Sequence, residues 1–343
     1  MRGMSRGFLS AAGSLLAVAM AASPAPAQTG AGFYKGKTVT YIAATSPGGG
    51  YDAYARLVAA YMQKHLPGSN FVVKNMPGAG HLIGANAIYA ANPDGLTIGI
   101  FNTGLIYNQL IKNPGVGFDL ARMSWIGKAA SDPRVITIGS QSTIKSFQDL
   151  VEYKGVVNFA TGGIGSATYV ESVMLANVLN LPVKVLTGYS GDEDQSAVQR
   201  GEIGGAVSSR SSWEPFVRKG HGRFIAQIGG IDDDVPQLAS MVTDPTAEAL
   251  IALIQSQGDI GRLTAGPPGI PEDRLAALRN AYRAALEDPE LLANAKKRLM
   301  PIDPLYGEDV AKRIKEALNQ KPETMILIKR ALEKKRTASS DMP

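Results

Sequence analysis

The sequence contains no cysteine, which excludes a disulfide framework, a thiolate metal site and a lipid-modified cysteine behind a leader segment. Histidine is almost as scarce. His65, His81 and His221 are the only three, and their spacing matches no zinc motif. We therefore expect no metal site and no cofactor.

Signatures of catalysis are missing as well. No Gly-x-Ser-x-Gly nucleophile elbow occurs, since Ser166 is one residue out of frame, and no lysine follows the glycines at 48–50 as a phosphate-binding loop requires. Basic residues are scattered or lie in the last helical patterns, without interleaved aromatic residues, so a nucleic-acid partner is not expected. After residue 27 no apolar run is long enough to span a bilayer.

The N-terminal residues have the pattern of an export signal. Arg2 and Arg6 precede a short apolar stretch over residues 7–22, and the small residues of "APA" follow at 25–27. This pattern predicts a signal peptide over residues 1–27, cleaved near Gln28, and a mature protein in the periplasm. At the other end, residues 336–343 are predicted to form a frayed tail.

Between these ends, apolar runs rich in β-branched residues alternate with helical patterns. Residues 37–44 and 70–75 read as strands, and between them apolar residues from Tyr54 to Leu66 recur on one helical face. The rhythm restarts near residue 131, and the last third is nearly all helical. This order predicts two α/β units with largely parallel sheets.

Five turns rich in glycine, serine or threonine follow predicted strands. They are "SPGGGYD" (46–52), "NMPGAG" (75–80), "NTG" (102–104), "GGIGSAT" (162–168) and "GYSGDE" (188–193). Ligands of open α/β sheets bind outside the carboxyl ends of strands, and helix N-termini attract anions. Because three turns belong to the first unit and two to the second, we expect a cleft between two lobes that grips a small anion.

Four of these segments resemble the solute receptors of tripartite tricarboxylate transporters, the Bug-type receptors. They are "SPGGGYDAYARLVA", "NMPGAGHLIGANAIYAANPDGLTIG", "GSAT" and "GYSG", and the likeness extends from Lys37 to Leu332. The resemblance implies a two-lobed α/β periplasmic binding protein of type II whose lobes are joined by crossing strands. It implies a monomeric receptor, not an enzyme, that binds a small organic acid and delivers it to an inner-membrane permease. Residues 35–132 plus 257–335 would form lobe one, and residues 133–256 lobe two.

The resemblance also implies the residues that hold the ligand. They are Ser46, Pro47, Gly48, Gly49, Tyr51 and Asp52 in the first turn, Gly78, Ala79 and Gly80 in the second, Thr103 in the third, and Gly165, Ser166, Ala167, Thr168, Tyr189, Asp192 and Ser208 in lobe two. Backbone N–H groups and hydroxyls would hold a carboxylate, and no buried arginine is needed. For Asp52, a role at the start of its helix is favoured over ligand contact.

The sequence departs from the family pattern at two places in lobe two. Tyr169 stands at the usual histidine, and Asp192, Glu193 and Asp194 follow the last turn, where the family has few charges. Acids at a helix start also stabilise the helix itself, so a purely structural role is open. If instead Asp192 faces the ligand, its charge favours a monocarboxylate with a neutral or amino-bearing far end over di- and tricarboxylates.

Two alternatives to a transport receptor share this pattern. One is an exported α/β hydrolase or transferase that uses a glycine turn as an oxyanion hole, although no base lies beside a candidate nucleophile. The other is a receptor of the same fold that serves a sensor or another transporter class.

Overall fold

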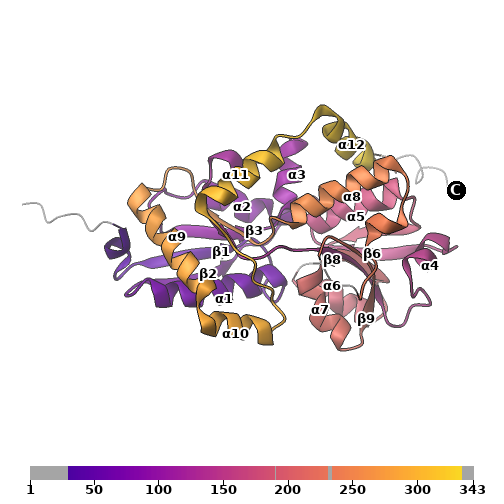
Figure 1. The fold of residues 1–343 in the computed structure, drawn as a ribbon, viewed down its shortest axis with the longest axis horizontal. Coiled ribbons are helices and arrows are strands. Elements are labelled where there is room, and N and C mark those ends of the chain that lie inside the picture. Colours follow the sequence, from indigo (N-terminus) through magenta and orange to yellow (C-terminus); the bar gives the residue numbers. More distant parts are fainter. Residues whose placement is uncertain (1–29, 190, 231–233, 334–343) are drawn as a thin grey trace, which may run out of the picture.

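The computed structural model describes residues 30–189, 191–230 and 234–333. The predicted signal peptide and the predicted tail lie outside these residues. The described chain folds into two α/β lobes that lie side by side along the long axis of the molecule (Figure 1). None of the described helices combines the length and the hydropathy needed to cross a membrane.

Lobe one is built on a six-stranded sheet with strand order β11-β4-β10-β3-β1-β2. Its strands are β1 (Thr38–Ala43), β2 (Asn70–Asn75), β3 (Thr97–Phe101), β4 (Ser124–Lys128), β10 (Leu263–Gly266) and β11 (Leu305–Tyr306). Its helices are α1 (Gly50–His65), α2 (Leu82–Tyr89), α3 (Gly104–Leu110), α9 (Glu272–Glu287), α10 (Pro289–Lys297) and α11 (Gly307–Leu318), with short 3-10 turns at Gly30–Tyr34, Ala79–His81 and Leu120–Arg122.

Lobe two is built on a five-stranded sheet with strand order β7-β6-β8-β5-β9. Its strands are β5 (Arg134–Gly139), β6 (Val157–Thr161), β7 (Val183–Thr187), β8 (Gly205–Ser209) and β9 (Gly222–Ile228). Its helices are α4 (Phe147–Glu152), α5 (Ala167–Val178), α6 (Glu193–Gln199), α7 (Arg210–Arg218) and α8 (Pro245–Gly258), with a 3-10 turn at Leu238–Met241.

Helices cover both faces of the sheet of lobe one, and the side-chain alternation of β1 shows why. Val39, Tyr41 and Ala43 belong to the core cluster that includes α1 and α9, whereas Ile42 belongs to the cluster that includes α2 and α11. A strand buried on both faces reads as a continuous apolar run. This agrees with the strand predicted from residues 37–44.

The pairing of the strands is mixed, not largely parallel as the sequence pattern predicted. β1 pairs in parallel with β2 and β3, and β6 pairs in parallel with β7 and β8. β10 is antiparallel to β3 and β4, and β5 is antiparallel to β8 and β9. β5 and β10 each receive the chain from the other lobe, so no crossover helix within one lobe forces them to be parallel.

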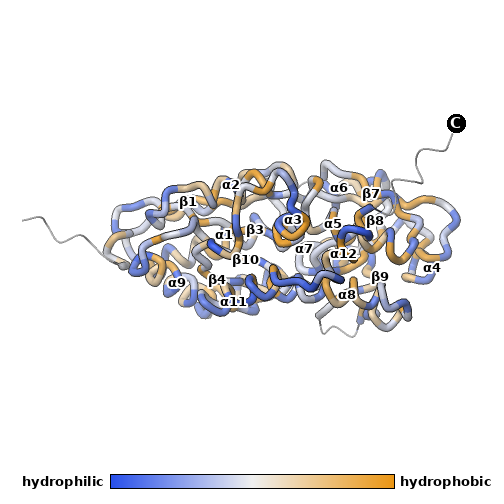
Figure 2. Tube along the Cα trace, turned by 90° about the horizontal axis from the view of Figure 1, so that it is seen from above, coloured by the Kyte–Doolittle hydropathy of each residue, from blue (hydrophilic) through white to orange (hydrophobic). Residues whose placement is uncertain are grey.

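The chain crosses between the lobes along residues 129–133, 259–262 and 319–321. The last crossing carries α12 (Pro322–Glu333) onto lobe two, where it packs against α5 and α8 (Figures 1 and 2). The side-chain amide of Asn177 in α5 donates to the carbonyl of Ala331 over 2.6 Å. The boundary expected from the sequence, which placed residues up to 335 in lobe one, therefore differs from the structure at α12.

Replacing one buried residue of α12 tests this assignment. Ile328 is fully buried in the core of lobe two, so Ile328→Ala should lower the free energy of unfolding by about 2–5 kcal/mol. Ile326 on the same helix is 49% exposed, and Ile326→Ala should change it by less than about 0.5 kcal/mol. Urea denaturation measures both, and equal effects would contradict the packing of α12.

Candidate functional site

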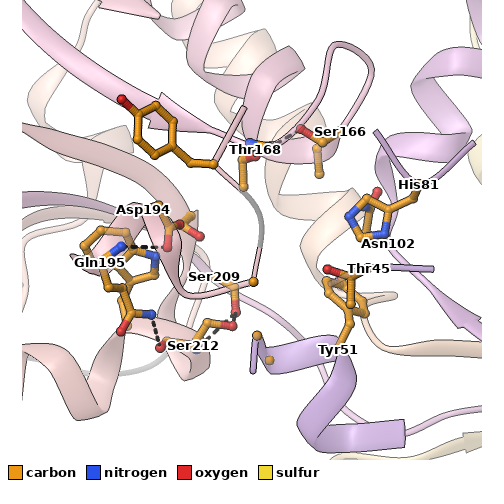
Figure 3. Close-up of a pocket in the computed structure, with 18 of the residues that line it drawn as sticks. Thr45, Tyr51, His81, Asn102, Ser166, Thr168, Asp194, Gln195, Ser209 and Ser212 are labelled. Carbon is orange, nitrogen blue, oxygen red and sulfur yellow. Dashed lines mark hydrogen bonds between the residues drawn. The ribbon is translucent and has the colours of Figure 1, made fainter. Parts of the chain in front are cut away.

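A small cavity of about 90 Å³ lies between the two lobes. Figure 3 shows it with His81, Asn102, Thr45 and Tyr51 on one side and Asp194 and Gln195 on the other. Its lining consists of Thr45, Gly49, Gly50, Tyr51, His81 and Asn102 from lobe one, and Arg134, Gly162, Ser166, Ala167, Thr168, Tyr189, Gly191, Asp194, Gln195, Ser208, Ser209, Ser212 and Trp213 from lobe two.

The cavity brings together part of the set expected from the sequence. Gly49, Tyr51, Ser166, Ala167, Thr168, Tyr189 and Ser208 line it. Ser46, Pro47, Gly48, Asp52, Gly78, Ala79, Gly80, Thr103, Gly165 and Asp192 do not, although they lie in the turns around it. The structure adds Arg134, which the sequence analysis did not single out and which is buried and lines the cavity.

Asp52 holds the first glycine turn in place. Its buried carboxylate accepts hydrogen bonds from the backbone N–H of Gly48 over 3.1 Å and from the side-chain amide of Asn75 over 2.8 Å, and it pairs with Arg56 over 2.9 Å. Burial by itself would raise the pKa of Asp52, but the hydrogen bonds from Arg56, Asn75 and Gly48 lower it below its ordinary value. The structure thus gives Asp52 contacts that stabilise the turn.

Removing this charge should affect stability in a pH-dependent way. Because the folded-state pKa of Asp52 is lowered, its stabilising effect is present above the ordinary aspartate range near pH 4 and is lost as the pH falls through the folded-state value. Asp52→Asn should therefore lower the melting temperature at pH 7 and differ less from the parent protein near pH 3. An unchanged melting temperature at pH 7 would contradict this role.

Two helices begin at the cavity, one in each lobe. Gly49, the N-cap of α1, supplies no side-chain acceptor, so the first N–H groups of this 16-residue helix have no side-chain cap. The hydroxyl of Ser166, the N-cap of α5, accepts from the N–H of Tyr169 over 3.2 Å and bonds the hydroxyl of Thr168 over 3.1 Å. Both helix starts contribute partial positive charge where Tyr51 and Ala167 line the cavity.

His81 enters the cavity from a strained turn. Four consecutive residues, Gly78 to His81, have positive φ angles, and for Ala79 and His81 this conformation is uncommon. The turn places the His81 ring against Tyr51, with ring centroids 5.7 Å apart. Burial and the nearby Arg262 lower the pKa of His81 to about 4, so the imidazole is neutral near pH 7. Its Nδ1 and the Tyr51 hydroxyl are buried and have no hydrogen-bond partner among the described residues.

A cluster of buried charges lies beneath the cavity, where the chain first crosses between the lobes. Arg134 pairs through Nη1 with Asp132 over 3.1 Å and through Nε with Glu171 of α5 over 2.7 Å, and its Nη2 donates to the Thr103 hydroxyl over 3.3 Å. Burial lowers the pKa of Arg134, but the carboxylates of Glu171 and Asp132 raise it by more, so the guanidinium stays charged. Burial raises the pKa of Glu171 to about 7, against the lowering effect of Arg134.

Arg262, on the second crossing, extends this cluster to lobe one. Its guanidinium stacks on the rings of Tyr51 and Tyr54 in α1, at 4.2 and 4.7 Å from their centroids. One of its nitrogens, Nη2, lies 3.5 Å from the Asp132 carboxylate. The same nitrogen donates to the hydroxyls at the start of α7, namely Ser209 (2.8 Å), Ser211 (2.9 Å) and Ser212 (3.1 Å).

The two lobes touch around the cavity through bare backbone. The side-chain amide of Asn108 in α3 donates to the carbonyl of Gly165 in lobe two over 2.6 Å. A Cβ on Gly163 would lie 2.5 Å from the backbone nitrogen of Gly80, and a Cβ on Gly49 would lie 2.9 Å from the carbonyl oxygen of Gly191. Contacts this short leave no room for a side chain, so the cleft is closed here because glycines meet across it.

A single methyl group should hold the lobes apart. The φ of Gly163 is an ordinary one and the atoms closest to its missing Cβ all belong to lobe one, so Gly163→Ala should leave thermal stability unchanged or slightly higher. It should weaken ligand binding about tenfold or more and enlarge the ligand-saturated radius of gyration in small-angle scattering. Gly115→Ala, away from the cleft and near a movable Leu82 side chain, is the matched control. Unchanged affinity in Gly163→Ala would contradict closure through these glycines.

The described residues show no group of three or more histidine, aspartate or glutamate side chains arranged to hold a metal ion. A cavity enclosed by two α/β lobes, with crossing segments beneath it and a helix start from each lobe, defines a two-lobed solute-binding receptor. A family model described as "Tripartite tricarboxylate transporter family receptor" matches residues 54–331. The chain belongs to this family, and the resemblance found in the sequence is confirmed.

Curated relatives and solved structures agree with this assignment. A protein of Bordetella pertussis is 25% identical over 324 residues, which cover 89% of this chain and 92% of that protein. A protein of Pseudomonas sp. (strain P51) is 30% identical over 171 residues, 48% of this chain, and the match spans half of that protein's length.

Among solved structures, the periplasmic binding protein BugD has a TM-score of 0.73 at 22% identity, with 87% of this chain and 98% of that chain covered. MatC from Rhodopseudomonas palustris, solved with bound malate, has a TM-score of 0.71 at 21% identity, with 85% and 99% covered. These two structures confirm the two-lobed α/β fold.

Several lining residues carried no clear signal in the sequence. The resemblance singled out Thr103 and Gly80, but their neighbours Asn102 and His81 line the cavity instead. The sequence analysis therefore found the right turns and missed the side chains that enter the cavity. Arg134 is the first residue of the apolar strand β5, a position where a charged residue usually marks the surface end of the strand. Asp194 lines the cavity and Asp192 does not. The sequence alone could not distinguish them, because the difference depends on where α6 lies.

Proposed function

We propose that this protein is a periplasmic receptor that closes on a small organic carboxylate and delivers it to a tripartite tricarboxylate-type permease. The observation that carries the proposal is the cavity between the lobes, where the starts of α1 and α5 contribute to the lining. Membership of the receptor family supports the same role, and so does the malate in the structure of MatC.

The size of the cavity suits a small acid. On a scale where one water needs about 10–15 Å³, a volume of about 90 Å³ holds roughly six to nine water-sized atoms. Each backbone N–H that donates to a carboxylate contributes about 1.5–3 kcal/mol net. Four such bonds, less the cost of ordering, are sufficient for the roughly 8 kcal/mol of a micromolar complex.

Residues of both lobes would hold the ligand. The N–H groups of Gly50 and Tyr51 and those of Ala167 and Thr168 are the candidate donors to a carboxylate, with the hydroxyls of Thr45 and Ser208 beside them. The Arg134 guanidinium is already paired with Asp132 and Glu171, so the backbone N–H groups, and not this arginine, are the expected partners of the carboxylate.

A thermal-shift screen tests the proposal. Short-chain mono-, di- and tricarboxylates and amino acids are added to the mature protein, and a bound ligand at 100 times its Kd should stabilise the fold by about 2.7 kcal/mol, which raises the melting temperature by several degrees. The acid should be recovered chemically unchanged. If no acid shifts the melting temperature, or if the acid is converted, the receptor function is contradicted.

Delivery is tested separately, with membrane vesicles that contain the permease. Uptake of the labelled acid should require the receptor, and the Gly163→Ala variant should support less uptake than Gly115→Ala. Uptake that is equal with and without the receptor would contradict the permease as partner.

A further inference from the structure

The cavity has two sides of opposite electrical character. On one side lie the uncapped start of α1 at Gly50 and Tyr51 and the neutral His81, and the start of α5 at Ala167 adds further N–H groups. These N–H groups favour a negative group. On the other side lies the carboxyl group of Asp194, with Gln195 next to it (Figure 3). A ligand that spans the cavity therefore meets donors at one end and an acid at the other.

Asp194 lies at the cavity without a cation beside it. Its Oδ1 accepts a hydrogen bond from the backbone N–H of Gln195 over 2.7 Å, and among the described residues no arginine, lysine or histidine forms an ion pair with it. Burial, together with the neighbouring charges of Asp192 and Glu193, raises the pKa of Asp194 to about 7. The protein keeps a carboxyl group in a place where ionisation is unfavourable until a cation arrives.

We propose that the ligand of this receptor is an aminated monocarboxylate, such as an α- or ω-amino acid, and that Asp194 selects it by pairing with the ammonium group. This inference rests on the proposed function, because it assumes a carboxylate at the helix starts. A second carboxylate in place of the ammonium group would face Asp194 directly. Two negative charges in contact repel strongly in a partly desolvated site. The receptor should therefore discriminate against diacids of the same length.

Asp192 provides the matched control. It is exposed and precedes α6 at the rim, where its carboxylate is 3.4 Å from the position of a Cβ on Gly48. It carries the same charge as Asp194, two residues away, but it does not line the cavity. A general effect of negative charge would appear in both Asp192→Asn and Asp194→Asn, whereas pairing inside the cavity would appear only in the second.

The pH dependence has a defined sign. As the pH falls from 8 to 6, Asp194 gains a proton and stops attracting an ammonium group, so the affinity for an amino acid should fall about tenfold while that for a diacid should rise. The charged and titratable groups around Asp194 are Asp192 and Glu193 beside it in the chain, Tyr189 on the preceding turn, and Arg134, Arg262, Glu171, Tyr51 and His81 at or beside the cavity. His81 stays neutral in this range, whereas Glu171, with a pKa of about 7, also titrates in it. The contribution of Asp194 is therefore the part of the pH dependence that Asp194→Asn removes.

Calorimetry with matched probes tests the inference. The probes are β-alanine with succinate, 4-aminobutanoate with glutarate, and the twenty common amino acids. We expect an aminated acid to bind at least tenfold tighter than its diacid counterpart. Asp194→Asn should weaken the binding of the aminated acid at least tenfold and remove most of its pH dependence. Asp192→Asn should change the affinity for the aminated acid less than threefold.

A stability measurement separates selection from a structural role of Asp194. Because burial raises its folded-state pKa, Asp194 lowers the stability of the ligand-free protein progressively as the pH rises above the ordinary aspartate range near 4, and the loss is complete above the folded-state value. Asp194→Asn should therefore raise the melting temperature at pH 8. A residue that only stabilised α6 would lower it. If Asp194→Asn does not fold, Asp194→Ser takes its place in both measurements.

The outcomes distinguish this inference from the proposed function. If a diacid or a tricarboxylate binds the parent protein best, or if Asp194→Asn leaves amino-acid binding unchanged, the aminated ligand is wrong and the carboxylate receptor stands. If no organic acid of either kind binds, the proposed function fails and this inference fails with it.

Discussion

A buried cluster of two arginines and two carboxylates, at the place where the chain crosses between the lobes, holds the cavity in its shape. Arg134 joins Asp132 to Glu171 and thereby ties the crossing segment to α5. Arg262 joins the same Asp132 to the aromatic rings at the start of α1. The two helices whose N-termini line the cavity are therefore positioned by one charged network, in which each guanidinium lies beside a carboxylate.

Such a network constrains the protein more than it stabilises it. A buried ion pair contributes little to the net free energy of folding, because the cost of desolvating the charges offsets their attraction. Removing one member of a pair leaves a buried, unpaired charge, which lowers the stability by about 3–5 kcal/mol. Loss of Glu171 or Asp132 would leave Arg134 and Arg262 with a single carboxylate between them. The start of α5, which includes Ser166, thus depends on residues that never reach the ligand.

Local patterns predicted much of the fold, since they arise within single elements. Residues 70–75, which the sequence predicted as a strand, form β2 with the same bounds. The course of α12 could not be read this way, because the contacts with α5 and α8 that hold it on lobe two join segments far apart in the chain.

The turns of the site could be predicted from the sequence, but most of the side chains that line it could not. The glycine turns stand out in the sequence because they need special backbone geometry, whereas the side chains that enter the cavity are chosen by contacts between segments far apart in the chain. Arg134 illustrates this, since its partner Glu171 lies 37 residues later and its other neighbour Thr103 lies 31 residues earlier. Nothing near Arg134 in the sequence distinguishes it from a surface charge.

The acids at 192–194 show how helix geometry decides which charge a ligand meets. Asp192 is the N-cap residue of α6 and lies at the rim opposite Gly48, whereas Asp194, in the first turn, lines the cavity. The carboxyl group of Asp194, which lines the cavity, is also the one of the three that burial makes hardest to ionise. The glycine contacts that close the cleft therefore strengthen the effect of this acid on a ligand. Closure lowers the local dielectric, and a lower dielectric increases the difference between a ligand that neutralises Asp194 and one that repels it.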